Sequence, residues 1–230
     1  MRGRFGRLMT AALFASGLLW GCAAGRPSTI DDVALARLPR GSLEPVNEQR
    51  LEVSRANDEM ARADTRVHDA EAERDLAHDE QKVATASHDH AQQLIKMGQT
   101  ERDAGKIDEG KRELDAVMAR KAAADAHVAA AEARIDFARA EKAVARQRSD
   151  LAQLHLERSK YQALKIANDP VAAKFSDEQY AKAIANEEND LRDADLRVEK
   201  AREQFAARSQ QWQAKQRRFE AAGPHRPHGG

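Results

Sequence analysis

Small residues recur at every seventh position along much of the chain. From residue 45 to about residue 103 the repeated position holds alanine six times in succession and then glycine. Side chains seven residues apart share one helix face, and a strict seven-residue repeat keeps that face on a partner when helices supercoil left-handedly. The pattern therefore predicts long helices that pack side by side. The row consists of Ala56, Ala63, Ala70, Ala77, Ala84, Ala91 and Gly98.

Prolines and capping residues predict where the helices begin and end. Pro45 is a favourable first helical residue, and the next proline is Pro170. Within the proline-free stretch, Gly105 and Asp108 predict that one helix ends and another begins. Ser176 opens a capping-box sequence, which predicts the start of a third helix. The predicted helices span about 45–103, 109–165 and 176–221.

The second and third helices carry rows of different size. At every seventh position the second helix has mostly alanine, from Ala124 to Ala152. The third helix has mostly large side chains at its seventh positions, from Ile184 to Phe219. Small rows facing a large row fill space without cavities, and short connections favour antiparallel neighbours in one chain. We expect an all-α fold, an elongated alanine-rich antiparallel three-helix bundle or coiled coil. Coiled-coil pairing with separate chains is the alternative.

The predicted lengths leave one end of the bundle uncovered. At 1.5 Å per residue the first two helices run about 85 Å and the third about 70 Å, so the third ends near the level of Ala91. The apolar cluster at this free end is a candidate partner-binding tip, but the same side chains can simply close the hairpin against one another. The tip residues are Leu94, Ile95, Met97, Ile107, Leu114, Val117 and Met118.

A short apolar segment near the N-terminus ends at the only cysteine of the chain. Arginines precede the apolar stretch 8–20, which would rise about 20 Å as a helix, short of the roughly 30 Å hydrocarbon core of a bilayer. Residues 1–21 are therefore predicted to be a signal peptide. The lone Cys22 cannot form a disulfide within the chain.

The residues around the cysteine point to one kind of attachment. Leu19-Trp20-Gly21-Cys22 resembles the lipobox of bacterial lipoproteins, although Trp20 departs from the small or aliphatic residue usual there. The resemblance implies cleavage before Cys22 and acylation of that residue. Ala23 in the next position resembles lipoproteins sent to the outer membrane of Gram-negative bacteria, facing the periplasm. An ordinary signal peptide with an incidental cysteine is the alternative.

Two segments are expected to lie outside the bundle. Pro27 and Pro39 favour a flexible tether over 22–44, with a helical turn or two around 30–38. Residues 222–230 are rich in proline and glycine and are predicted to be a disordered tail.

Charge and motifs restrict the possible functions. The formal net charge is zero for the whole chain, and no basic patch suggests nucleic-acid binding. Gly105 to Lys111 has the spacing GxxxxGK, but Arg112 stands where a phosphate loop has Ser or Thr, so we expect no nucleotide. His88 and His90 lack the four-residue spacing that converges on a metal. With no catalytic motif, neither enzymatic activity nor a cofactor is expected.

These observations predict a membrane-anchored periplasmic lipoprotein that acts as a structural or adaptor element of the cell envelope. Beyond the signal region the chain is similar in composition and layout to helical-rod lipoproteins of Gram-negative bacteria. The expected partners are the membrane, through the lipid on Cys22, and an envelope protein of unknown identity. The alternative is a holdase-type chaperone with helical arms, which resembles the tentacled periplasmic chaperones. Such arms are generally joined by a β-rich body, and the sequence contains no strand-like segment to build one.

Overall fold

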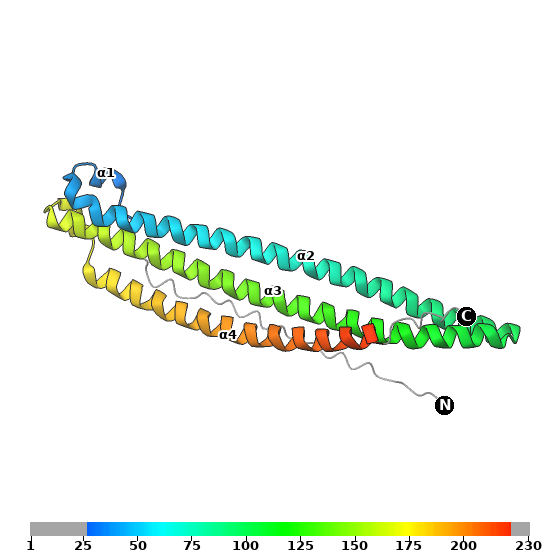
Figure 1. Cartoon of the computed structure of the whole chain (residues 1–230). Helices are drawn as coiled ribbons and strands as arrows, with labels where there is room; N and C mark the ends of the chain where they lie inside the picture. Colours follow the sequence, from blue (N-terminus) through cyan, green and yellow to red (C-terminus); the bar gives the residue numbers. More distant parts are fainter. Residues whose placement is uncertain (1–26, 222–230) are drawn as a thin grey trace, which may run out of the picture.

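The computed structural model describes residues 27–221, and this part of the chain contains helices and turns but no β-strand. The expected all-α antiparallel bundle is confirmed, because three long helices run side by side in alternating directions (Figure 1). In chain order the elements are α1 (Asp32–Leu35), η1 (Arg40–Leu43), α2 (Glu44–Glu101), α3 (Ala104–Ile166), η2 (Pro170–Lys174) and α4 (Asp177–Ala221).

The two ends of the bundle are built differently. We call the end that holds α1, η1 and η2 the base, and the end that holds the turn between α2 and α3 the tip (Figure 1). Residues 1–26 and 222–230 lie outside the described residues. The predicted signal peptide, Cys22 and the predicted tail therefore have no structural description.

The alanine row of α2 forms its contact with α3. Five alanines of the row have no exposed surface, and branched side chains of α3 pack against them, Ile135 on Ala70 and Val128 on Ala77. A methyl side chain lets two helix backbones approach closely while leaving room for a larger side chain across the interface. The five alanines are Ala63, Ala70, Ala77, Ala84 and Ala91.

The turn at the tip differs from the predicted one. Arg102 adopts a left-handed backbone with a φ of 57°, and the Asp103 carboxylate accepts hydrogen bonds from two backbone N–H groups of the first turn of α3. The helix therefore begins at Ala104 rather than near residue 109, because Asp103 caps its first turn ahead of the restart predicted at Asp108.

The start of α4 agrees with the prediction. The Ser176 hydroxyl accepts a hydrogen bond of 3.1 Å from the backbone N–H of Gln179, as a capping box requires. The helix then runs without interruption to Ala221, the last described residue.

The helix α3 lies between the other two long helices (Figure 1). Both α2 and α4 pack along α3, whereas α2 and α4 do not pack along each other. The structure thus differs from the expected arrangement, in which the large row of α4 fills the space between two small rows. That row packs on α3 and stays half-buried, because the third side of a closed bundle is missing. Its half-buried members are Leu191, Val198, Phe205, Trp212 and Phe219.

The hairpin of α2 and α3 extends beyond the end of α4 (Figure 1). Near the end of α4, Phe219 lines a groove together with Ala123 of α3 and Glu80 of α2. The remaining residues of α2 rise about 30 Å further to the turn. The prediction that the third helix leaves the tip uncovered is confirmed, although α4 ends below the predicted level of Ala91.

Residues 30–44 pack on the base, so the expected flexible tether over 22–44 is wrong for this part. Ile30 and Leu35 are each 3% exposed and join an apolar cluster with the end of α3 and the start of α4. The expected turn of helix around 30–38 is confirmed by α1. The fixation was not predicted because the stretch between Pro27 and Pro39 is only eleven residues long, too short to show a periodicity.

Candidate functional site

A buried ion pair at the base holds the N-terminal segment in place. Glu157 and Lys160 of α3 are 4% and 7% exposed. The backbone N–H of Ile30 donates to Glu157 Oε2 at 2.6 Å, and Lys160 Nζ donates to the Ile30 carbonyl oxygen at 3.2 Å. The same ammonium lies 3.0 Å from Glu157 Oε1 and 2.9 Å from Asp32 Oδ1. Both backbone groups of Ile30 are therefore bound by charged side chains of α3.

The charges of this cluster stabilise one another. Burial alone would lower the pKa of Lys160, but hydrogen bonds to Asp32 and Glu157 outweigh it and raise the pKa above its ordinary value. The hydrogen bond from Lys160 is also the main reason that the pKa of Asp32 is lowered. Lys160 therefore remains an ammonium, and Asp32 a carboxylate, across the neutral range of pH.

Aromatic side chains fill the base beneath this cluster. Tyr180 of α4 has no exposed surface, and its ring lies 5.6 Å from the ring of Tyr161 and 6.4 Å from that of Phe175. Its hydroxyl makes no hydrogen bond within residues 27–221. Burial raises the pKa of Tyr180 to about 12. The base is thus a packed core that joins α3, α4 and the N-terminal segment.

The fixation of Ile30 sets how far the base can lie from the predicted attachment point. Ile30 is the eighth residue after Cys22. A fully extended chain spans at most about 3.3 to 3.6 Å per residue, so Cys22 and Ile30 lie no more than about 29 Å apart. The fixed point is on the base, at the opposite end of the molecule from the tip (Figure 1).

Most of the predicted tip residues are buried or half-buried in the hairpin of α2 and α3. Val117 is buried, and four others are half-buried in the hairpin: Leu94, Ile95, Ile107 and Leu114. Only Met97 and Met118 are strongly exposed, at 48% and 56%. The structure therefore places most of this cluster in closing the hairpin and leaves two methionines available to a partner.

Two glycines allow the helices to approach at the tip. A Cβ atom at Gly98 would lie 2.8 Å from the backbone nitrogen of Ile107, and one at Gly110 would lie 2.9 Å from the backbone nitrogen of Ile95. These separations are too short for a side chain of any size. Gly98 continues the alanine row of α2. Gly110 stands in register with the row of α3, fourteen residues before Ala124, but its role was missed because the predicted row of small residues began only at Ala124.

A contact among all three long helices was also missed by sequence reasoning. His127 of α3 is 7% exposed, its Nδ1 lies 2.7 Å from Glu80 Oε2 of α2, and its ring stacks on Trp212 of α4 at 4.2 Å. The histidine is isolated in the sequence, and no spacing indicated its neighbours. This contact ties the far end of α4 to the other two helices.

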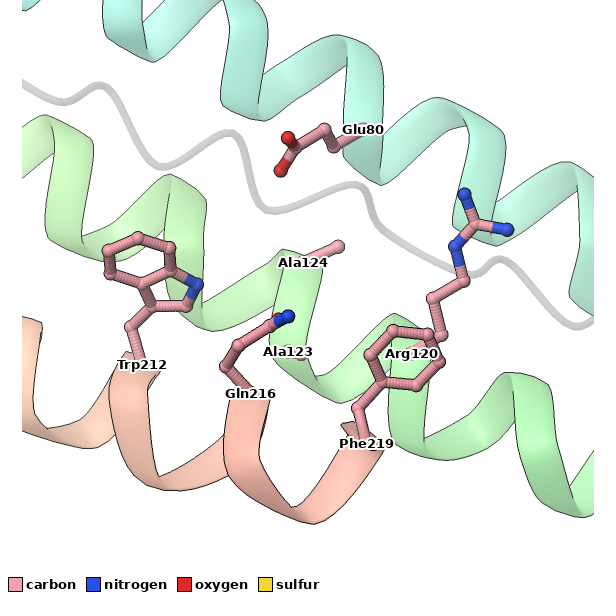
Figure 2. A pocket seen from close by; sticks show the side chains of 7 residues that line it. All are labelled: Glu80, Arg120, Ala123, Ala124, Trp212, Gln216 and Phe219. Atoms are coloured by element: carbon pink, nitrogen blue, oxygen red, sulfur yellow. The ribbon is translucent and has the colours of Figure 1, made fainter. Parts of the chain in front are cut away.

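The groove beside this contact is shallow and built from three helices. Figure 2 shows Trp212, Gln216 and Phe219 of α4 on one side and Glu80 of α2 on the other. Ala123 and Ala124 of α3 form its floor. The groove offers the rings of Trp212 and Phe219 for contact with another side chain. Its one carboxylate, on Glu80, already contacts His127.

Among the described residues, neither the histidines nor the GxxxxGK segment forms the kind of site weighed in the sequence. In the range 27–221 no cluster of three or more His, Cys, Asp or Glu side chains is suited to hold a metal ion. The GxxxxGK segment at 105–111 lies inside α3 and is helical, so it does not form the loop that surrounds phosphates in nucleotide-binding proteins.

The comparisons with known proteins give no family. No protein-family description, no curated protein and no solved structure matches this chain. Among the helices of residues 27–221, none is both long enough and apolar enough to cross a membrane.

Proposed function

We propose that the protein is a lipoprotein whose acylated Cys22 holds it in a membrane, and whose helical rod acts as a structural or adaptor element of the cell envelope. The segment Leu19–Cys22 resembles a lipobox, which supports the lipid attachment. Ala23 supports the outer membrane as the location of the protein. Several acyl chains on one cysteine would make the attachment stable, whereas a single chain gives only marginal binding.

One observation carries the proposal: Ile30 is fixed to the base only eight residues after Cys22. A flexible tether over the full range 22–44 would let the rod point in any direction far from its anchor. The short connection instead keeps the base within about 29 Å of the acylated residue. The end of the molecule that carries the fixed segment is therefore the end that faces the membrane.

The length of the rod gives the proposed adaptor its reach. The longest helix, α3, has 63 residues, which corresponds to about 95 Å. With the base at the membrane, the tip lies at the far end of this length and exposes Met97 and Met118. A flexible, polarizable methionine adapts to different apolar partners. The tip is thus the part of the anchored rod that most easily meets an envelope protein.

Crosslinking in cells tests this role. A photoreactive residue at Met118 should capture an envelope protein, whereas one at Leu196, which is 70% exposed on the side of α4, should not. The capture should also disappear in a Cys22→Ser variant, because the rod is then no longer held at the membrane. Capture of the same neighbours from both positions, or only from Leu196, would contradict an adaptor that acts through its tip.

A further inference from the structure

The charges of α4 are distributed unevenly along its length. The half from residue 177 to 198 has seven acidic and three basic side chains, a formal charge of −4. The half from 199 to 221 has three acidic and six basic side chains, a formal charge of +3. The helix therefore has an acidic half next to the base and a basic half toward the tip.

The charges of α2 and α3, by contrast, are paired with each other along the interface. Ion pairs and histidine–carboxylate contacts cross between these helices from near the base to near the tip, with lengths that include 3.1 Å for Arg66 with Glu141 and 3.2 Å for His90 with Glu113. The other crossing pairs are Glu59 with Arg148, Asp64 with Lys142, Glu71 with Arg139, Glu73 with Arg134 and Glu80 with His127.

The helix α4 lacks such pairs along most of its length. Asp177 at its start is paired with Arg158 and Lys165 of α3. Beyond Asp177, and with Glu187 and Asp150 left aside, no ion pair joins α4 to another helix within residues 27–221. Lys215 acts on Asp125 only at longer range, where it helps to lower the pKa of that carboxyl. Most charges in the two halves of α4 are therefore available to a partner outside the chain.

The position of α4 leaves room for such a partner. It packs along α3 alone, at the edge of the three-helix layer (Figure 1). Its row of large side chains from Leu191 to Phe219 is only half-buried there, and Leu196 on another face is 70% exposed. A helix with available charges and partly exposed apolar side chains is the kind of surface that a second helix covers.

We propose that α4 pairs with α4 of a second copy of this chain in antiparallel orientation. In that orientation the acidic half of each copy faces the basic half of the other, so the same attraction occurs twice about a two-fold axis. A parallel pair would place like charges together in both halves. Self-complementary charge favours a second copy over an unrelated partner, which would need the opposite polarity by coincidence.

The proposal is independent of the lipid attachment, and the two can fail separately. In an antiparallel pair the two bases lie at opposite ends. Two copies anchored in one membrane therefore cannot pair along the whole of α4 while both stand upright. Association would decide whether a rod projects from the membrane or lies along it.

The first test measures association of the full chain carrying Cys22→Ser, so that no acyl chain contributes. Sedimentation equilibrium should show a dimer that weakens about tenfold or more when salt is raised, because exposed charges are screened. Two charge-reversal variants should each lose association by about 100-fold or more, since like charges then face each other. They are Asp190→Lys, Asp193→Lys, Asp195→Lys and, separately, Arg208→Glu, Arg217→Glu, Arg218→Glu.

Mixing the two variants is the decisive step. One variant then has two basic halves and the other two acidic halves, so the mixture should form a heterodimer of about the original strength. This rescue also shows that both variants are folded. A matched control, with Glu48→Lys, Asp58→Lys and Asp69→Lys on exposed positions of α2, changes the net charge by the same amount as the Asp→Lys variant and should leave association unchanged.

Orientation is tested with a single introduced cysteine in the Cys22→Ser chain, which otherwise has none. Lys182→Cys and Arg217→Cys lie near opposite ends of α4. A mixture of the two chains should form a mixed disulfide, whereas each alone should crosslink little. A monomeric Cys22→Ser chain, charge-reversal variants that associate as strongly as the parent, or efficient self-crosslinking at both positions would each overturn the proposal.

Discussion

The course of the N-terminal segment depends on two charged residues that are almost completely buried. Glu157 and Lys160 bind both backbone groups of Ile30 and also pair with each other. Burying a charge is costly unless a partner and hydrogen bonds compensate for it. Here the backbone of the N-terminal segment supplies part of the compensation. The segment and the ion pair are therefore expected to be stable only together.

Replacing one member of this pair should destabilise the base. Lys160→Met leaves the Glu157 carboxylate buried without its ammonium, and we expect a loss of about 3 to 5 kcal/mol in the free energy of unfolding. The double variant Glu157→Gln/Lys160→Met should lose less than the single one, because no unpaired charge remains. Urea unfolding followed by circular dichroism measures both. A single variant as stable as the parent would show that the pair does not hold the segment.

The exposed pair of Lys82 with Asp79 provides a matched control for this experiment. Both side chains of the pair are largely exposed, and they lie on α2 away from the base. The substitution Lys82→Met should leave stability nearly unchanged, since exposed ion pairs contribute little. A similar loss in both lysine variants would mean that the change from lysine to methionine, rather than burial, causes the effect.

Tyr180 should make the protein sensitive to alkaline pH. Its pKa is raised to about 12 by burial, above the ordinary value of 10.0. Stability linked to this group is complete below about pH 10 and is lost as the pH rises through about 12, because the unfolded chain releases the proton first. Thermal melts between pH 9 and 12 should therefore show a smaller decline for Tyr180→Phe than for the parent.

At neutral pH the same variant should be at least as stable as the parent. The Tyr180 hydroxyl makes no hydrogen bond within residues 27–221, so its removal relieves a buried unpaired group. An equal decline with pH in parent and variant would show that burial of this hydroxyl does not govern the alkaline response.

At the scale of helices, the seven-residue repeat made most of the fold predictable. Long uninterrupted repeats and few prolines located all three helices, and the structure moves their ends only slightly except at the tip turn. The neighbours of each helix were harder to predict. A small row such as that of α2 fits closely against many partners, so the sequence did not show that α4 packs along α3 alone. Buried residues such as His127 and Glu157 have no periodic signal of their own.

The close contact between α2 and α3 should be sensitive to side-chain size. Ala70 has no exposed surface and packs against Ile135 and Ala138. The substitution Ala70→Leu should overpack this contact and cost about 1 to 3 kcal/mol. Ala72→Leu, at an exposed position of the same helix, should change stability by less than about 0.5 kcal/mol. Thermal unfolding that shows no difference between the two variants would contradict close packing of the alanine row of α2 against α3.

At the scale of the whole molecule, the two ends of the rod have different roles in the proposed function. The base contains a packed core and holds the segment that leads to Cys22, whereas the tip is a hairpin not covered by α4 (Figure 1). The sequence predicted the uncovered tip from helix lengths alone. It did not predict how firmly the N-terminal segment is fixed, because that depends on hydrogen bonds to side chains 127 and 130 residues away.

The attachment through Cys22 is the central claim, and membrane fractionation of a Cys22→Ser variant tests it most directly. The parent chain should be found with the membranes and should carry acyl chains on Cys22. The variant should be released from the membranes with the same helical content, because residues 27–221 do not include a helix that could span a bilayer. A Cys22→Ser chain that still fractionates with membranes would contradict attachment through this residue.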